Sequence, residues 1–129
     1  MTLEEFHLAL EEIAGRLPKQ LFDRLNGGVN IREEVCMSPE SVPQELRYIL
    51  GKYHHYRVLG RWIDLYYGSF ARAFANADEH TWRQEMDRVL RHELRHHMED
   101  QAGENTLREE DKRDMMAYKL RHHQGEELK

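Results

Sequence analysis

Residues 86–103 read MDRVLRHELRHHMEDQAG, and within them His92-Glu93-Leu94-Arg95-His96 is the motif around which the fold is expected to form. Side chains four residues apart lie one turn above each other on the same face of an α-helix, so His92 and His96 can hold one metal ion between them. Neutral imidazoles are ordinary zinc ligands, and a neighbouring carboxylate can take the proton of a water that attacks a carbonyl. The pattern therefore predicts a Zn²⁺ site with His92 and His96 as ligands and Glu93 as general base.

The motif alone is a weak indication, because the chain is rich in the residues that it requires. With 9 histidines among 129 residues, a random order of the same composition would contain the pattern about 0.08 times per chain. The surrounding helix is more informative. Its apolar stripe is formed by Trp82, Met86, Val89 and Leu90. Glu93 and His97 lie on the continuation of this stripe, and the two expected ligands lie along its edge. Polar groups at the margin of a buried stripe need partners, and a metal with its ligands would supply them.

The composition limits the classes of function. A length of 129 residues fits one compact domain, and a net charge of -5 argues against nucleic acid as a partner. The sequence has no apolar run that could span a membrane and no signal peptide at its N-terminus, so we expect a soluble, cytoplasmic protein that does not bind membranes. Cys36 is the only cysteine, so no internal disulfide can form, which fits a reducing compartment.

The sequence predicts an α+β fold in a single domain. Apolar residues at helical spacing follow Thr2 and Glu5, which form a capping box, so a first helix is expected over residues 3–17. A short helix from Pro18, a strand over 29–37 and a short helix within 41–50 are expected next. Two strands over 52–59 and 61–70 follow and meet in a hairpin at Gly60. The motif helix is expected from Thr81 to Gly103, and a last helix from Thr106.

These elements predict a small mixed sheet of about three strands, with an active-site helix and flanking helices. We assign residues 1–123 to the domain and expect residues 124–129 to be a disordered tail.

The order of these elements resembles the small, single-domain zincin-like predicted metallopeptidases of bacteria. Three stretches carry the resemblance: ILGKY (49–53), IDLYYGSF (63–70) and RVLRHELRHHMEDQAG (88–103). In that family a strand of the type I-x-L-Y-x-G precedes a helix that carries H-E-x-x-H-H. The resemblance runs from about Phe6 to Tyr118. It implies a zincin-like fold, a Zn²⁺ cofactor, the hydrolysis of peptide bonds and a peptide or protein substrate.

The third zinc ligand does not follow from the resemblance. Many members of that family have an aspartate ten residues after the first histidine, where this chain has Ala102. Asp111 is favoured as the third ligand, since a turn after the motif helix would bring the last helix back over the site. Glu110, whose spacing resembles that of the thermolysin-like gluzincins, and Glu99, which shares the face of the first histidine, are the alternatives.

Three further residues are candidates for contacts around the metal or with substrate. His97 follows the motif on the apolar stripe and is interpreted as a satisfied core residue or as a hydrogen-bond partner of a ligating carboxylate. His122 shares a helix face with Asp111 and could hydrogen-bond a tetrahedral intermediate. Tyr66 lies in the strand before the motif helix, which in zincins lies at the edge of the cleft and pairs with an extended peptide.

Two other functions stay open at this point. The first is a non-catalytic metal-binding domain with a zincin fold that acts in regulation or interaction. The second is a structural domain whose motif holds no metal. The oligomeric state is not fixed by the sequence.

Overall fold

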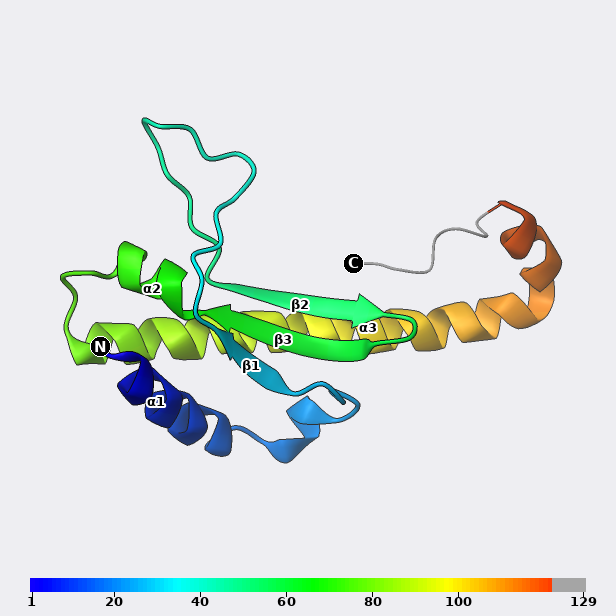
Figure 1. Ribbon diagram of the computed structural model, residues 1–129. Coiled ribbons are helices and arrows are strands. Elements are labelled where there is room, and N and C mark those ends of the chain that lie inside the picture. The colour runs from blue at the N-terminus through cyan, green and yellow to red at the C-terminus, as the bar shows by residue number, and fades with distance from the viewer. Residues whose placement is uncertain (122–129) are drawn as a thin grey trace.

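The structure is a computed structural model that describes the backbone of residues 1–121 and the side chains of residues 1–104. The chain forms, in order, α1 (Leu3–Gly15), the 3-10 helix η1 (Lys19–Phe22), β1 (Val29–Arg32), β2 (Gly51–Tyr56), β3 (Gly60–Tyr66), α2 (Tyr67–Ala73) and α3 (Glu79–Arg121), as Figure 1 shows. In this part of the chain, none of the helices combines the length and the apolar character that a membrane span requires.

The sheet is mixed and has three strands, as the sequence predicts. Its order is β1-β3-β2, with β1 parallel and β2 antiparallel to the central β3. The predicted hairpin at Gly60 is confirmed: its φ is 97°, and the Asn26 side chain lies where a Cβ would stand. The expectation that the strand before the motif helix lies at an edge is wrong, because β3 is central and β2 forms that edge.

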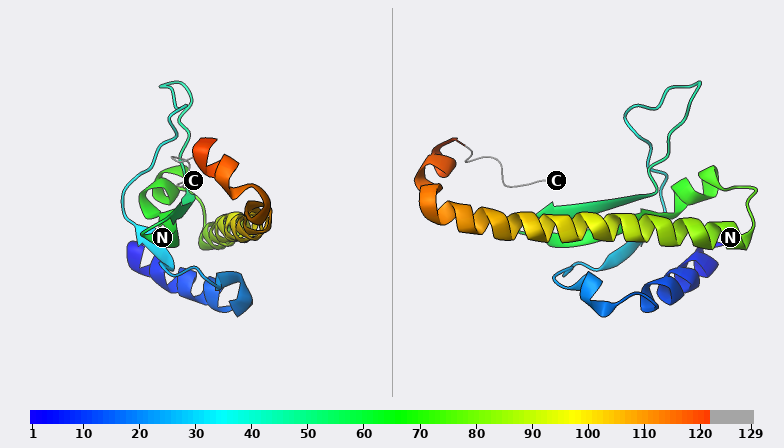
Figure 2. Two further views of the ribbon diagram at one scale, coloured as in Figure 1. Left: turned by 90° about the vertical axis from the view of Figure 1, so that its right-hand side faces the viewer. Right: turned by 180° about the vertical axis from the view of Figure 1, so that it is seen from behind.

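The core lies between the sheet and the helices, and α3 runs across one face of the sheet (Figure 2). Ile63 and Leu65 of β3 are fully buried on that face. Phe6 of α1 packs edge-on against the Phe70 ring, with the ring centroids 5.1 Å apart. The predicted apolar stripe of the motif helix is confirmed, since its members Trp82, Met86, Val89 and Leu90 are all buried. Each such side chain contributes about 1.5–3 kcal/mol by its removal from water.

The motif helix does not end at Gly103, so the predicted turn and the separate last helix from Thr106 are wrong. α3 runs without interruption from Glu79 to Arg121, and Gly103 does not adopt a positive φ. A glycine within a helix costs only about 1 kcal/mol relative to alanine, and its neighbours here are good helix formers. The start also differs: Asp78 rather than Thr81 is the cap, because Asp78 Oδ1 accepts the Thr81 N–H at 2.9 Å.

Because α3 is continuous at Gly103, the direction in which Gly103→Ala changes the stability of the protein can be predicted. We expect the substitution to stabilise the protein by about 0.5–1 kcal/mol, because alanine favours helical backbone and open space surrounds the Cα. Urea unfolding of the two proteins measures the change. A loss of similar size would indicate instead that residue 103 ends a helix in a left-handed conformation.

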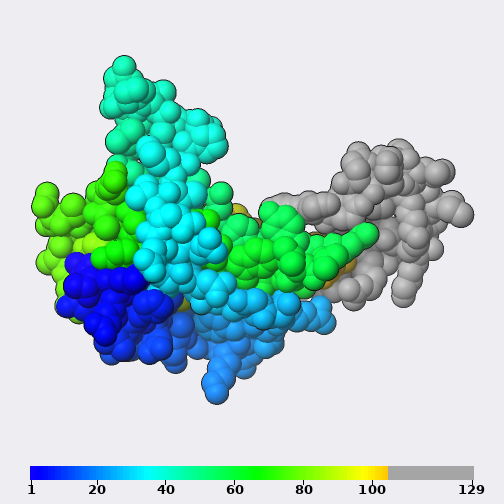
Figure 3. All heavy atoms as spheres, in the orientation of Figure 1, coloured from blue at the N-terminus to red at the C-terminus, as the bar shows by residue number. Residues whose placement is uncertain are grey.

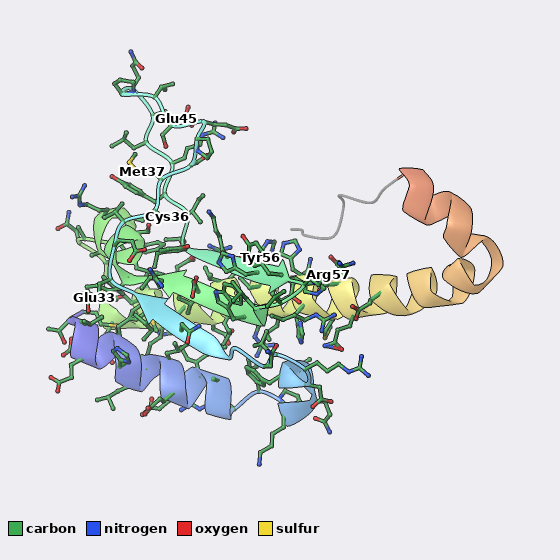
Figure 4. All side chains as sticks on the ribbon, turned by 45° about the vertical axis from the view of Figure 1, so that its right-hand side comes forward. Glu33, Cys36, Met37, Glu45, Tyr56 and Arg57 are labelled. Carbon is green, nitrogen blue, oxygen red and sulfur yellow. The ribbon has the colours of Figure 1, made fainter. Side chains whose placement is uncertain are left out.

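Residues 33–49 form an arm that projects from the body of the molecule (Figures 1 and 3). The strand predicted over 29–37 ends at Arg32, and the short helix predicted within 41–50 is absent, the arm having only isolated bridges. Ser41 does not cap a helix, because its hydroxyl accepts the Arg47 N–H at 2.9 Å and donates to the Arg47 carbonyl at 3.0 Å. Pro43 also disfavours helical backbone in the residue before it. Met37 and Glu45 mark the arm in Figure 4.

Candidate metal centre

His92 and His96 project from α3 one turn apart and converge on one point. Their Nε2 atoms are 3.2 Å apart, and their ring planes are almost perpendicular, at 89°. Two nitrogens bound to one tetrahedral zinc at about 2.0–2.1 Å would be separated by about 3.3 Å. The two imidazoles therefore have nearly the spacing that a single zinc ion requires, and both are exposed enough for an ion to reach them.

Glu93 occupies the buried side of the same helical turn. Only 7% of its surface is exposed. Burial raises the pKa of its carboxyl above the usual value, while the neighbouring His92 and His96 and the backbone of Tyr53 act in the opposite direction. The residue is thus a poorly hydrated carboxyl beside two convergent imidazoles, which is an environment that suits a proton acceptor.

A surface pocket of about 180 Å³ opens beside this turn of α3. Its lining consists of residues from the arm, from the start of β2 and from α3, namely Tyr48, Leu50, Gly51, Arg88, Val89, His92 and Glu93. Gly51 allows β2 to lie against α3 here, because a Cβ at this position would come within 2.7 Å of Val89 Cγ1. His92 and Glu93 therefore both border one open pocket.

The third ligand is not found among the side chains of residues 1–104, where no group of three or more metal-binding side chains comes together. Glu99 lies 3.8 Å from His96 Nδ1, the ring nitrogen that does not face His92. Asp111 and Glu110 lie outside the described side chains. The helix end expected at Gly103, which would have let a separate last helix bring Asp111 over the site, is absent, because α3 continues as helix through that position.

Of the other predicted site residues, His97 and Tyr66 do not join the histidine pair. His97 is fully buried, and its Nε2 lies 2.7 Å from the Asp23 carbonyl oxygen, so its interpretation as a satisfied core residue holds. Tyr66 extends from β3 with the opposite alternation to Ile63 and Leu65, and burial raises its pKa to about 12. It therefore lies on the face of the sheet away from α3. His122 lies outside the described residues.

A polar cluster between β2, β3 and α3 is not predicted from the sequence. Asp100 Oδ2 accepts hydrogen bonds from Tyr53 Oη at 2.8 Å and from Arg61 Nε at 3.1 Å, and His55 Nδ1 lies 2.8 Å from the same oxygen. The only available signal is that Tyr53 and His55 share one face of a strand and that Asp100 follows the motif on α3. No local pattern connects residues that are 47 positions apart.

Comparisons with known proteins place the chain in a family. No protein-family model matches it, and no curated protein matches it. The solved structure of a conserved hypothetical protein from Thermo thermophilus is 30% identical to it in sequence, with a TM-score of 0.68. The match covers 80% of this chain and 99% of the other. The chain belongs to the family of that protein. The conserved hypothetical protein shares the fold over nearly its whole length, and its name states no activity.

Proposed function

We propose that the protein is a zinc-dependent metallopeptidase with a zincin-like fold. The single observation that carries this proposal is the 3.2 Å separation of the two Nε2 atoms of His92 and His96, directly beside the buried carboxyl of Glu93. Residues four apart on a helix lie close together, and this spacing also fits a hydrogen bond between the two rings; the buried carboxyl beside them is what favours a metal site over a hydrogen-bonded pair. The donor set of two imidazoles also suits zinc.

Zinc bound between the imidazoles would polarise a carbonyl and lower the pKa of a bound water. The side chains of this protein would transfer the protons and orient the metal ligands. Glu93 accepts the proton of the attacking water and passes it to the leaving amine, and its raised pKa favours the first of these transfers. Glu99, near His96 Nδ1, favours a proton on that nitrogen and so leaves the Nε2 lone pair free for the metal. The ligand that completes the site is proposed to lie among the carboxylates beyond residue 104.

An extended peptide fits the surroundings of this site. β2 is an edge strand, and Tyr66 N–H donates to the Leu50 carbonyl at 2.9 Å. Because hydrogen-bonded pairs alternate in an antiparallel ladder, the main-chain groups of Gly51, Tyr53 and His55 point away from β3. A peptide strand can pair with such an edge, and Gly51 lies in the pocket beside His92. The edge is therefore the proposed binding site for the substrate main chain.

Metal analysis tests the site. We expect the purified protein to bind about one Zn²⁺ per chain after dialysis against zinc and then buffer, and His92→Ala and His96→Ala to retain less than about a tenth of that amount. His80→Ala is the matched control, because His80 is an exposed histidine at the start of the same helix. Elemental analysis by mass spectrometry gives the stoichiometry. Full zinc content in both motif variants would contradict the proposal.

A further inference from the structure

The pocket beside the histidine pair has the size of one side chain. Its volume is about 180 Å³, whereas sites for small molecules measure about 300–1,000 Å³. Tyr48, Leu50 and Val89 supply its apolar wall. Gly51, whose main chain belongs to the proposed peptide-binding edge, also lines it. A peptide that pairs with this edge can therefore place one of its side chains in the pocket.

The arm holds one wall of this pocket. Tyr48 lies at the base of the arm, where it forms a bridge with Met37 on the opposite side. Next to this pair, the Ile49 N–H donates to the Cys36 carbonyl at 2.7 Å. Backbone pairing thus closes the base of the arm and gives the Tyr48 wall a defined position.

Arg88 is the only residue with a permanent positive charge among the described residues that line the pocket. Its Nε and Nη2 atoms lie 2.9 and 2.8 Å from one oxygen of Glu85, which is not part of the lining. A guanidinium has five N–H donors in a rigid fork, so three remain when two are bound to this oxygen. Within residues 1–104 no second carboxylate is bound to Arg88. The ion pair thus orients the guanidinium and leaves it donors for a ligand.

The pocket has opposite charges on its two sides. Arg88 and Glu93 are five residues apart, which places them about 140° apart around the axis of α3. Arg88 is also one turn before His92, or about 6 Å along the axis. An extended peptide advances about 3.3–3.6 Å per residue, so the side chain of a residue next to the proposed scissile bond can reach Arg88. A carboxylate bound there lies on the side of the pocket away from Glu93.

We propose that the pocket selects peptide substrates that carry a carboxylate, and that Arg88 determines this specificity. The proposal rests on the proposed function, because it names the substrate class of the same site. A carboxylate matches the planar guanidinium with two parallel hydrogen bonds, and the apolar wall accommodates the stem that carries it. Either a glutamate or aspartate side chain or the C-terminus of a peptide offers Arg88 the same two oxygens.

Peptide binding to the metal-free, full-length protein tests the proposal, because the carboxylate then has no zinc to bind. The probes are three acetylated alanine pentapeptides. The first has a central glutamate and an amidated C-terminus, the second a central glutamine and an amidated C-terminus, and the third a central glutamine and a free C-terminal carboxylate. NMR titration of the ¹⁵N-labelled protein gives the dissociation constants, and shifts of the Leu50, Gly51 and Val89 amides locate the site.

We expect the wild type to bind one of the two carboxylate peptides about tenfold more tightly than the amidated glutamine peptide. The peptide that it prefers identifies the source of the carboxylate. Arg88→Ala is expected to remove the preference, and Arg91→Ala is the matched control. The Arg91 side chain is 61% exposed against 60% for Arg88 and is likewise paired with a carboxylate of α3, but it does not line the pocket. This control should keep the preference within about twofold.

Equal binding of the three peptides by the wild type, including no measurable binding at millimolar concentrations, would overturn the proposal. A preference that survives in Arg88→Ala would do the same, as would shifts that lie away from the pocket. A preference lost equally in Arg91→Ala would overturn it too, since it would reflect the overall charge of α3.

The binding experiment and the zinc analysis can fail separately. A chain that binds no zinc but prefers the carboxylate peptide contradicts the metallopeptidase and leaves the carboxylate pocket in place. Where the zinc-loaded wild type cleaves the preferred peptide, kcat/KM is expected to fall about tenfold in Arg88→Ala while the zinc content stays at the wild-type level.

Discussion

Glu93→Gln is expected to lower peptide hydrolysis by about 10²–10⁴-fold in kcat/KM while zinc binding stays at the wild-type level. The amide has nearly the same shape as the carboxyl but cannot accept the proton of the attacking water. The measurement is cleavage of a fluorogenic peptide library by zinc-loaded wild type and variant. Glu79→Gln is the control, since its carboxylate is exposed at the start of the same helix, where it pairs with Arg83, and it is expected to retain most of the activity. Equal cleavage by wild type and Glu93→Gln would exclude Glu93 as the base.

The same variant should change the stability of the zinc-free protein. Burial raises the pKa of Glu93, so the folded state binds this proton more tightly than the unfolded state does. The contribution to stability is then present below the unfolded pKa and is lost as the pH rises through the folded pKa. We expect Glu93→Gln to be more stable than wild type near pH 7 and to lose this advantage near pH 4. Urea unfolding at the two pH values measures it, and a less stable variant near pH 7 would contradict it.

Asp100→Asn should destabilise the protein by about 2–3 kcal/mol near neutral pH. Burial raises the pKa of the Asp100 carboxyl, but the hydrogen bonds from Tyr53 and Arg61 and the charge of His55 outweigh it, so the pKa lies below the usual value. The amide leaves Arg61, whose side chain is only 12% exposed, without its charged partner on this oxygen.

The sign of the pH dependence follows from this lowered pKa. The stabilisation by Asp100 is present above the unfolded pKa and is lost as the pH falls through the folded pKa. The gap between wild type and Asp100→Asn should therefore close on acidification, as measured by urea unfolding. Asp87→Asn is the control: Asp87 pairs with Arg91 on an exposed face, and the expected change is at most about 0.5 kcal/mol at any pH. A gap that does not depend on pH would show that the charge of Asp100 is not what stabilises the cluster.

The parts of the fold that could be predicted depend on patterns within a few residues. The capping box of Thr2 and Glu5 is present as expected, with Glu5 N–H donating to Thr2 Oγ1 at 3.1 Å. The apolar stripe of α3 and the turn at Gly60 are equally local. The prediction of a helix end at Gly103 is wrong because glycine permits a helix end without requiring one. In the arm, Ser41 had a cap pattern, but its hydroxyl is bound by Arg47, six positions along the chain.

In the candidate site, too, the contacts within one helix could be predicted and the contacts between elements could not. His92 and His96 converge because they are four residues apart on one helix, and their sequence positions alone are enough to predict this. The contacts of Tyr53 with Asp100 join a strand to a helix, and only the register of β2 on β3 and the packing on α3 bring them together. A motif can reveal ligands on one element, but it carries no information on the elements that hold them in place.

The open edge of β2 also bears on how the protein behaves in a crowded cell. Exposed edges with unpaired backbone groups are templates on which a second chain can add a strand and begin to aggregate. β2 has only six residues, Gly51–Tyr56, and it carries the exposed Lys52. Short edge strands and lysine side chains are two of the features by which proteins keep such edges from pairing with copies of themselves. The length and composition of β2 therefore limit the self-association that an open edge would otherwise allow.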